Sequence, residues 1–436
     1  MRRFGNGIFN TMSTFFQFSE NIEQAAAKAL QTASAQFATI DALTEYNQQK
    51  VLAAFIKHRV NEADFGTTTG YGYNDCGREK LDALTADIFG AESALIRVGA
   101  LACGTHTLSV CLYGVLRPTD VMLSVTGLPY DTIHSTIGID GEKSRGKGTL
   151  KDFGVLYRQV DLTETDELDY EKIEAEAAKP DVRMVYIQRS RGYSLRHSIS
   201  VAEIGRVCEI VHRVNKNAVV MVDNCYGEFT EEKEPTEVGA DLMAGSLIKN
   251  AGGGVAPSGG YIAGRKDLVE LCACRLTTPG LGAEVGATLG QNRSLFMGLF
   301  HAPHVVGEAL KTAVFAAALF ESFGYAVTPA PDEARHDIIQ AICLRDAERL
   351  IAFCQGLQKG APVDAYVTPE PWDMPGYDSQ VIMAAGTFTA GSSIELSGDA
   401  PLREPFAVWM QGGLNFHSGK LGVLLAAQEM ENRGLL

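Results

Sequence analysis

The sequence lacks an excess of basic residues and lacks any long apolar segment. It has 53 Asp and Glu residues against 38 Lys and Arg residues, which gives a formal net charge of −15. Such a chain is poorly suited to bind nucleic acid or an anionic membrane, because both partners present phosphate groups. No apolar run approaches the roughly 20 residues that a helix needs to cross a bilayer. We therefore expect neither nucleic acid nor a membrane as a partner.

Metal-binding cysteine motifs are also missing. The nine cysteines are scattered, and the pair Cys272 and Cys274 is too closely spaced for a CxxC motif and has no histidine cluster nearby. An odd number of scattered cysteines favours free thiols in a reducing cytoplasm. We therefore expect no metal site and a cytoplasmic location.

The N-terminus has no clear secretion signal. It carries two arginines, but it has no continuous apolar segment and no convincing cleavage site. Two interpretations of residues 1–11 stay open. They form either an extension upstream of a native start at Met12 or an arm that packs on a neighbouring subunit.

Short apolar segments alternate with helical segments from about residue 93 to 265. This alternation predicts an α/β fold with a mostly parallel sheet that is covered by helices on both faces. After about residue 300, a long helix is followed by short strands expected near residues 325–328, 365–368, 382–387 and 393–396. We expect an N-terminal helical arm (1–65, with a helix over 20–60), a large domain (66–300) and a small α+β domain (301–436).

Asp223 and Lys249 are the most informative residues of the chain. Asp223 closes the strand-like run 218–222, and Lys249 lies shortly before the three glycines 252–254. A buried carboxylate can keep a heterocyclic nitrogen protonated, and a lysine beside a glycine-rich turn can form an imine with an aldehyde. Both are requirements of pyridoxal 5′-phosphate (PLP) chemistry. The alternative is a surface lysine in a flexible loop.

Other strand ends offer groups that suit the phosphate and the ring of this cofactor. Gly104, Thr105 and His106 open an apolar helix, whose N-terminus favours a phosphate. Ser246 could donate to the same phosphate, and Tyr130 could stack on a pyridine ring. The alternatives are an ordinary helix cap at Thr105 and turn residues at the other two positions.

Arg189 and Arg191 follow the strand predicted at residues 182–188. Ligands of an open parallel sheet gather where strands end. A guanidinium group there could bind a phosphate or a substrate carboxylate through two hydrogen bonds. The alternative is a surface ion-pair patch.

Taken together, these motifs resemble fold-type I PLP enzymes, and more closely the methionine γ-lyase-related or cystathionine β-lyase-like "aluminium resistance" proteins. The resemblance spans roughly residues 15–430 and implies a mostly parallel seven-stranded sheet in the large PLP-binding domain. The segments that carry it are 70–75, 77–78, 104–106, 127–132, 188–193, 222–229, 246–250, 393–397 and 411–414.

The resemblance implies a role for each cofactor-binding residue. Lys249 would hold PLP covalently, Asp223 would pair with the pyridine nitrogen, and Tyr130 would stack on the ring. The residues that would hold the phosphate are Gly104, Thr105 and Ser246, with the backbone of His106 as a further donor.

The resemblance also implies that subunits share the active site. In related lyases, a tyrosine and an arginine from the neighbouring subunit complete the phosphate site, and Tyr71, Tyr73 and Arg78 occupy that loop here. We therefore expect a homodimer or homotetramer with active sites at the subunit interface. The familiar Tyr-x-Arg sequence of this loop reads Tyr71-Gly72-Tyr73, which removes the charge at that spacing.

A second departure concerns the substrate carboxylate. The strand that is comparable to the arginine-bearing strand of those lyases carries Glu395. Arg403 is the nearest substitute, Arg191 is the second choice, and Arg189 is a further candidate.

The implied activity is that of a PLP-dependent carbon–sulfur lyase acting on an amino acid such as cystathionine or methionine. Lys249 would remove the α-proton, and β- or γ-elimination would follow, with Tyr71 or Tyr130 as proton donor. The alternatives are an aminotransferase, another fold-type I lyase, or a PLP-binding stress-response protein without relevant catalysis. A nucleotide-binding protein is disfavoured, because a GxGxxG sequence and a Walker loop are absent.

Overall fold

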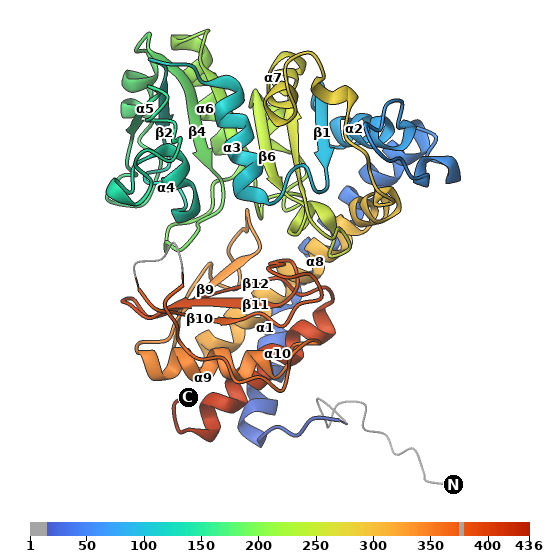
Figure 1. Ribbon diagram of the computed structural model, residues 1–436. Helices are drawn as coiled ribbons and strands as arrows, with labels where there is room; N and C mark the ends of the chain where they lie inside the picture. The colour runs from blue at the N-terminus through green and yellow to red at the C-terminus, as the bar shows by residue number, and fades with distance from the viewer. Residues whose placement is uncertain (1–14, 375–378) are drawn as a thin grey trace.

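The computed structural model describes residues 15–374 and 379–436. Figure 1 shows two separate sheets, one near the top of the view and one below it. The two interpretations of residues 1–11 lie outside the described residues.

The upper sheet has seven strands. In spatial order they are β1 (Ser93–Arg97), β7 (Gly260–Gly264), β6 (Leu242–Ser246), β5 (Val219–Asp223), β4 (Val182–Gln188), β2 (Val121–Ser124) and β3 (Leu156–Gln159). β7 runs antiparallel to both of its neighbours, and the other paired strands are parallel. All strands except the edge strand β3 are almost fully buried, as their apolar runs predict. The mostly parallel seven-stranded sheet is therefore confirmed.

Helices cover both faces of this sheet. Apolar side chains on one face pack with three helices: α3 (Gly104–Val115), α4 (Asp131–Ile137) and α7 (Lys266–Leu276). The other face packs with α2 (Cys76–Ile88), α5 (Tyr170–Ala177) and α6 (Val201–Val214). Local sequence fixes where these helices begin. For example, α6 starts with a capping box in which the side chains of Ser200 and Glu203 each accept from the other's backbone N–H.

The lower sheet has five strands, and each pairs antiparallel with its neighbours. In spatial order they are β10 (Val381–Ala384), β11 (Ser397–Pro401), β12 (Ala407–Gln411), β9 (Ile339–Cys343) and β8 (Ala326–Thr328). The helices α9 (Ala347–Gln358) and α10 (Phe416–Asn432) pack together beneath it in Figure 1.

Two of the short strands expected in this region are wrong in detail. Residues 365–368 form no strand, and Tyr366 and Val367 are exposed there. The strand expected at 393–396 lies instead at β11, a few residues later.

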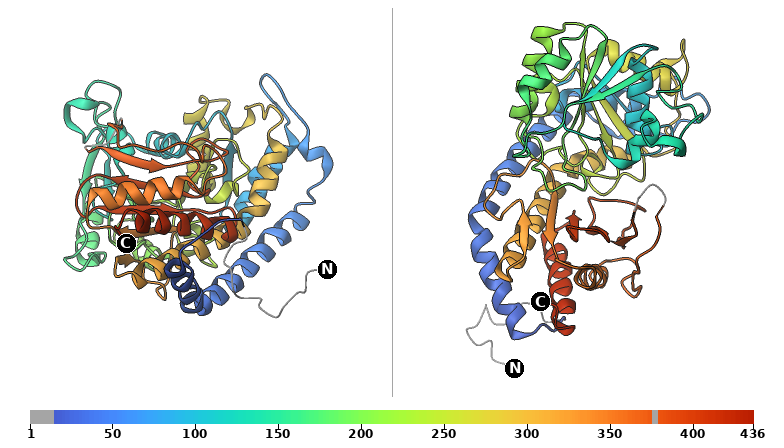
Figure 2. Two further views of the ribbon diagram at one scale, coloured as in Figure 1. Left: turned by 90° about the horizontal axis from the view of Figure 1, so that it is seen from below. Right: turned by 90° about the vertical axis from the view of Figure 1, so that its left-hand side faces the viewer.

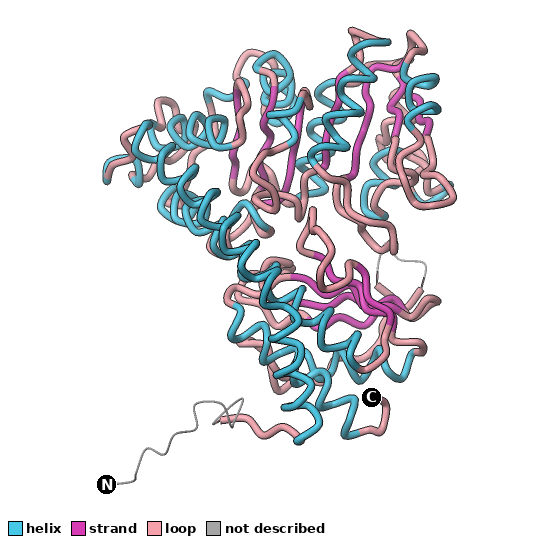
Figure 3. The backbone as a smooth tube through the Cα atoms, turned by 180° about the vertical axis from the view of Figure 1, so that it is seen from behind, coloured by secondary structure: helices cyan, strands magenta, loops and turns pink. Residues whose placement is uncertain are grey.

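Two long helices link the sheets. α1 (Glu20–Lys57) confirms the helix expected over residues 20–60, and it runs beside α8 (Asn292–Ser322) along the back of the molecule (Figures 2 and 3). The first half of α1 packs into the core of the lower sheet, through Ile22, Ala26 and Ala29, and its second half packs into the core of the upper sheet. Since α8 also contributes to both cores, the three-part division of the chain stays a prediction.

Candidate active site

Lys249 and Asp223 lie at the ends of neighbouring strands. Asp223 is the last residue of β5, and Lys249 lies in the turn that follows β6. The Lys249 Nζ atom lies 4.0 Å from the centre of the Tyr226 ring. Burial opposes the charge of Lys249, but Cys225, Tyr226 and Asp223 outweigh this effect and raise its pKa. The structure therefore places the predicted lysine and carboxylate close enough for the charge of each to shift the pKa of the other.

The Asp223 carboxylate is fixed by two donors. The Tyr186 hydroxyl donates to Oδ2 at 3.3 Å, and the Cys225 N–H donates to Oδ1 at 3.1 Å. Burial raises the pKa of Asp223 above its ordinary value, although the charge of Lys249 and the hydrogen bonds act in the opposite direction. A buried carboxylate in this position is suited to accept a hydrogen bond from a protonated ring nitrogen, because such a partner offsets the cost of burying the carboxylate charge.

The beginning of α3 has features that suit an anionic group. A Cβ atom placed on Gly104, the first residue of α3, would lie 3.1 Å from the Cβ atom of Ser246 at the end of β6. The Ser246 hydroxyl is buried and has no hydrogen-bond partner among the described residues. The His106 N–H, a predicted phosphate donor, instead donates to Cys103 Sγ at 3.4 Å. A free hydroxyl beside the first N–H groups of a helix still fits a phosphate. The residues present therefore fit the phosphate group of PLP.

Thr105 and His106 have local partners next to this site. The Thr105 hydroxyl lies 2.8 Å from that of Thr132, which follows Tyr130 by two residues. The His106 ring turns back along the chain, and its Nδ1 atom accepts from the Ala102 N–H at 3.1 Å. The hydrogen bond between Thr105 and Thr132 connects the beginning of α3 to the first turn of α4, which Tyr130 directly precedes.

Three of the predicted residues line one pocket of about 470 Å³. Tyr130, Arg191 and Arg403 form part of its wall, together with Gln188 and Tyr193. The Arg191 guanidinium is buried and donates to the Thr328 carbonyl at 2.8 Å. Arg403 is exposed, and its side chain forms no hydrogen bond or ion pair with any described residue. Arg403 is therefore the guanidinium that is free to bind a ligand in this pocket.

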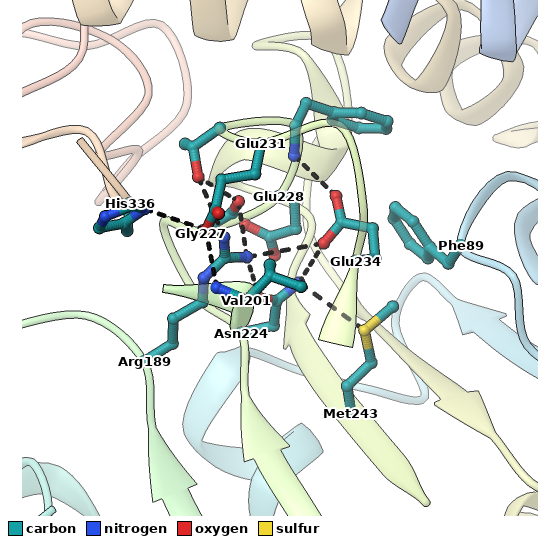
Figure 4. A network of polar contacts seen from close by, with 12 residues as sticks. Phe89, Arg189, Val201, Asn224, Gly227, Glu228, Glu231, Glu234, Met243 and His336 are labelled. Atoms are coloured by element: carbon teal, nitrogen blue, oxygen red, sulfur yellow. Dashed lines mark hydrogen bonds and ion pairs between the residues drawn. The ribbon is translucent and has the colours of Figure 1, made fainter. Parts of the chain in front are cut away.

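Arg189 lies in the interior instead (Figure 4). Its guanidinium donates to Asn224 Oδ1 at 2.8 Å and to Glu231 Oε1 at 2.7 Å, and it lies 3.7 Å from the fully buried Glu234. A buried cation is required there to compensate these acids. The contacts of Arg189 place it in this network, and it is absent from the wall of the pocket.

The loop that carries Tyr71 and Tyr73 faces outward, whereas Arg78 lies in the first turn of α2 and not in this loop. The two tyrosine rings stack 5.4 Å apart, and they are 67% and 51% exposed. Arg78 is buried and donates to the carbonyls of Gly72 at 2.7 Å and Gly286 at 2.9 Å. Arg78 thus holds the loop in place, while the tyrosines are accessible to another molecule.

Asp399, in β11 of the lower sheet, lies near Lys249 and Tyr193 and is not among the predicted site residues. Its Oδ2 atom accepts from the Tyr193 hydroxyl and from Gln411 Nε2, both at 3.1 Å. Burial raises the pKa of Asp399 above its ordinary value, although these two hydrogen bonds and the charge of Lys249 act in the opposite direction. The strand expected at residues 393–396 ends before Asp399, so the sequence gives no signal for this residue.

Glu395 has a structural role that accounts for its place near this strand. Its carboxylate accepts from the backbone N–H groups of Phe388 at 2.8 Å and Thr389 at 3.0 Å. Glu395 therefore fixes the preceding loop, in which the Ser392 hydroxyl donates to the Ile248 carbonyl at 3.1 Å.

No helix within residues 15–374 or 379–436 is long and apolar enough to cross a membrane. In the same residues, no group of three or more His, Cys, Asp or Glu side chains could hold a metal ion. None of the nine cysteines, all within the described residues, forms a disulfide bond.

The fold and the strand-end site define an α/β protein of PLP-dependent fold type I. The structure resembles that of the Escherichia coli protein YhfS, described as pyridoxal-5′-phosphate dependent, with a TM-score of 0.60 over 90% of this chain and 97% of YhfS. At 15% sequence identity, this likeness concerns the fold alone. The family model for methionine gamma-lyase matches residues 22–431, so the chain belongs to this family.

Similar proteins cover almost the whole chain. The Bacillus subtilis protein YnbB is 46% identical over 397 residues, which cover 91% of this chain and 93% of YnbB. The crystal structure of a carbon–sulfur lyase involved in aluminium resistance from Clostridium novyi NT has a TM-score of 0.91 and 47% identity. That match covers 95% of this chain and 96% of the Clostridium chain.

Proposed function

We propose that this protein is a PLP-dependent lyase that cleaves a carbon–sulfur bond in a sulfur-containing amino acid similar to cystathionine or methionine. Membership of the methionine γ-lyase family and similarity to the Clostridium novyi carbon–sulfur lyase support the reaction class. The observation that carries the proposal is the grouping of Lys249 and Asp223 at adjacent strand ends, with the unpaired Ser246 hydroxyl beside Gly104.

Four side chains, together with the backbone at the beginning of α3, would hold the cofactor. Lys249 would attach to it covalently, Asp223 would accept a hydrogen bond from its ring nitrogen, and Tyr130 would stack on the ring. The phosphate would bind to Ser246 and to the N–H groups at the beginning of α3. When bound, PLP supplies an electron sink that makes the α-proton of an amino acid acidic.

The chain's own side chains would then move protons and orient the substrate. The Lys249 amine, once displaced by the substrate amine, would take the α-proton. Tyr130, or Tyr71 of a second subunit, would give a proton to the departing sulfur. Arg403 would bind the substrate carboxylate, because its guanidinium is the unpaired one in the pocket. β- and γ-elimination would both use these groups.

A homodimer or homotetramer in a reducing cytoplasm belongs to the same proposal. The exposed, stacked rings of Tyr71 and Tyr73 support an assembly in which this loop reaches a second subunit. Size-exclusion chromatography with light scattering tests the assembly, and a monomer at micromolar concentration would contradict it.

The proposal is tested with purified protein, PLP and a panel that includes cystathionine and methionine. We expect a visible absorbance band from the bound cofactor and release of thiol and keto acid. Lys249→Ala should lose both, while Lys172→Ala, on an exposed helix position, should keep both. Formation of the amine form of the cofactor with a keto acid would instead indicate an aminotransferase. A band that no amino acid changes would indicate a PLP-binding protein without this catalysis.

A further inference from the structure

The lower sheet presents one face to the candidate active site. Asp399 of β11 lies opposite Trp409 of β12 in the antiparallel register, so the two side chains share a face of the sheet. The face that carries Trp409 packs against Tyr193 and Tyr226, which lie in loops at the strand ends of the upper sheet. Asp399 thus lies on the same side as the groups around Lys249, and Figure 1 shows this sheet directly beneath those loops.

Asp399 presents an incompletely bonded carboxylate on this face. Both of its donors, the Tyr193 hydroxyl and the Gln411 amide, bind the same oxygen, Oδ2. Within the described part of the chain, Oδ1 accepts no hydrogen bond, and the side chain keeps some solvent exposure. An oxygen that is free and accessible can receive a donor from a ligand.

The charge of Asp399 also needs a partner. Its two donors are neutral, and the cation that acts on it is Lys249. In the proposed function, the Lys249 amine takes the α-proton of the bound substrate, so it must be unprotonated and cannot serve as a cation for Asp399 at that stage. The largely buried Asp399 carboxylate would then lack a neutralising charge, which is costly unless the substrate supplies one.

We propose that Asp399 binds an ammonium group in the side chain of the substrate, beyond the sulfur atom. The substrate's α-amine is needed at the position of the Lys249 amine, so the group that reaches Asp399 is a second one. Tyr193 joins the two regions, because it donates to Asp399 and also lines the pocket that contains Arg403. This inference rests on the proposed function and narrows the substrate class to sulfur-containing amino acids with a second, cationic group.

A matched pair of amino acids tests the inference. S-(2-aminoethyl)-L-cysteine and S-propyl-L-cysteine have side chains of the same length and differ in ending with an ammonium or a methyl group. Dissociation constants for the PLP-loaded protein are measured from the change in cofactor absorbance on binding, separately from thiol release. We expect the aminoethyl compound to bind about tenfold or more tightly, as for a charge-assisted hydrogen bond.

Asp399→Asn should reduce this ratio to about one and leave the affinity for S-propyl-L-cysteine within about twofold. Asp166→Asn is the matched control, because Asp166 is an exposed carboxylate on the wall of the same pocket. It should keep the wild-type ratio. Unchanged S-propyl-L-cysteine binding shows that Asp399→Asn is folded. If Asp399→Asn does not fold, the wild-type protein is tested instead with S-carboxymethyl-L-cysteine, whose side chain ends in an anion. Tighter binding of this compound than of S-(2-aminoethyl)-L-cysteine would overturn the inference.

The outcomes separate this inference from the lyase proposal. Equal affinities in the wild type, or a preference that survives Asp399→Asn, would overturn the inference even if thiol is released. A preference that is lost in Asp399→Asn, without thiol release from either compound, would sustain the inference and refute the lyase. No absorbance change with either compound would overturn both.

Discussion

Replacing Ser246 by alanine should have opposite effects on the cofactor-free protein and on cofactor binding. The Ser246 hydroxyl is buried without a hydrogen-bond partner, which costs about 1–3 kcal/mol. Removing it should therefore stabilise the cofactor-free protein. For a chain of 436 residues, the unfolding entropy near the transition is about 0.9 kcal/mol/K, so the melting temperature should rise by about 1–3 °C.

Binding of PLP should weaken in the same variant. A hydrogen bond to a charged phosphate contributes about 1.5–3 kcal/mol, so the dissociation constant should rise about 10- to 100-fold. Thermal unfolding of the cofactor-free protein and an absorbance titration with PLP measure the two effects.

Ser397→Ala is the matched control for this experiment. The Ser397 hydroxyl is also buried and unpaired, but it lies in β11 of the lower sheet. Its removal should raise the melting temperature similarly without changing the affinity for PLP. The reasoning is refuted if Ser246→Ala binds PLP as tightly as the wild type, or if it destabilises the cofactor-free protein.

Three further predictions concern Asp223, Arg189 and Glu203. Asp223→Asn should still bind PLP through the lysine but lower turnover by about 100-fold or more, because an amide cannot keep the ring nitrogen protonated; steady-state kinetics with a tenfold or smaller loss would contradict this. Arg189→Leu leaves the buried Glu234 unpaired and should destabilise the protein by about 3–5 kcal/mol in denaturant unfolding, and a loss below about 1 kcal/mol would argue against the network. Burial opposes ionisation of Glu203, but hydrogen bonds with His197 and Ser200 outweigh this effect and lower the pKa of Glu203 to about 2. Because the ordinary pKa is near 4.5, the ionised carboxylate stabilises the folded protein at any pH above about 4.5. Glu203→Gln should therefore be less stable than the wild type at pH 7, and the difference should shrink as the pH falls from about 4.5 towards 2; a difference that stays constant over this range would show that the linkage is absent.

The sequence predicts the upper sheet well and the lower sheet only in outline. Six strands of the upper sheet are almost fully buried, so their apolar runs are conspicuous, and the helices between them favour parallel pairing. The exposed edge strand β3 has no such run and was not predicted. The antiparallel direction of β7 leaves no trace in a pattern of apolar residues. In the lower sheet, β9 and β12 escaped prediction, and residues 365–368 have strand-type residues but no strand beside them.

The candidate site shows the same division. Lys249, Asp223 and Ser246 each follow or end a strand of one sheet, so strand order alone predicts that they meet. Which of Arg189 and Arg191 reaches the pocket depends on acids far along the chain, and the local sequence does not contain that information. Asp399 comes from the other sheet, and its position depends on how the two sheets pack.

The covalent link between the cofactor and the chain tests the central claim most directly. The PLP-loaded protein is reduced with borohydride, digested and examined by mass spectrometry to locate the pyridoxyl group. We predict that the group is found on the peptide that contains Lys249, and that Lys249→Ala carries none. A stable pyridoxyl group on a different lysine, with Lys249 unmodified, would contradict the account.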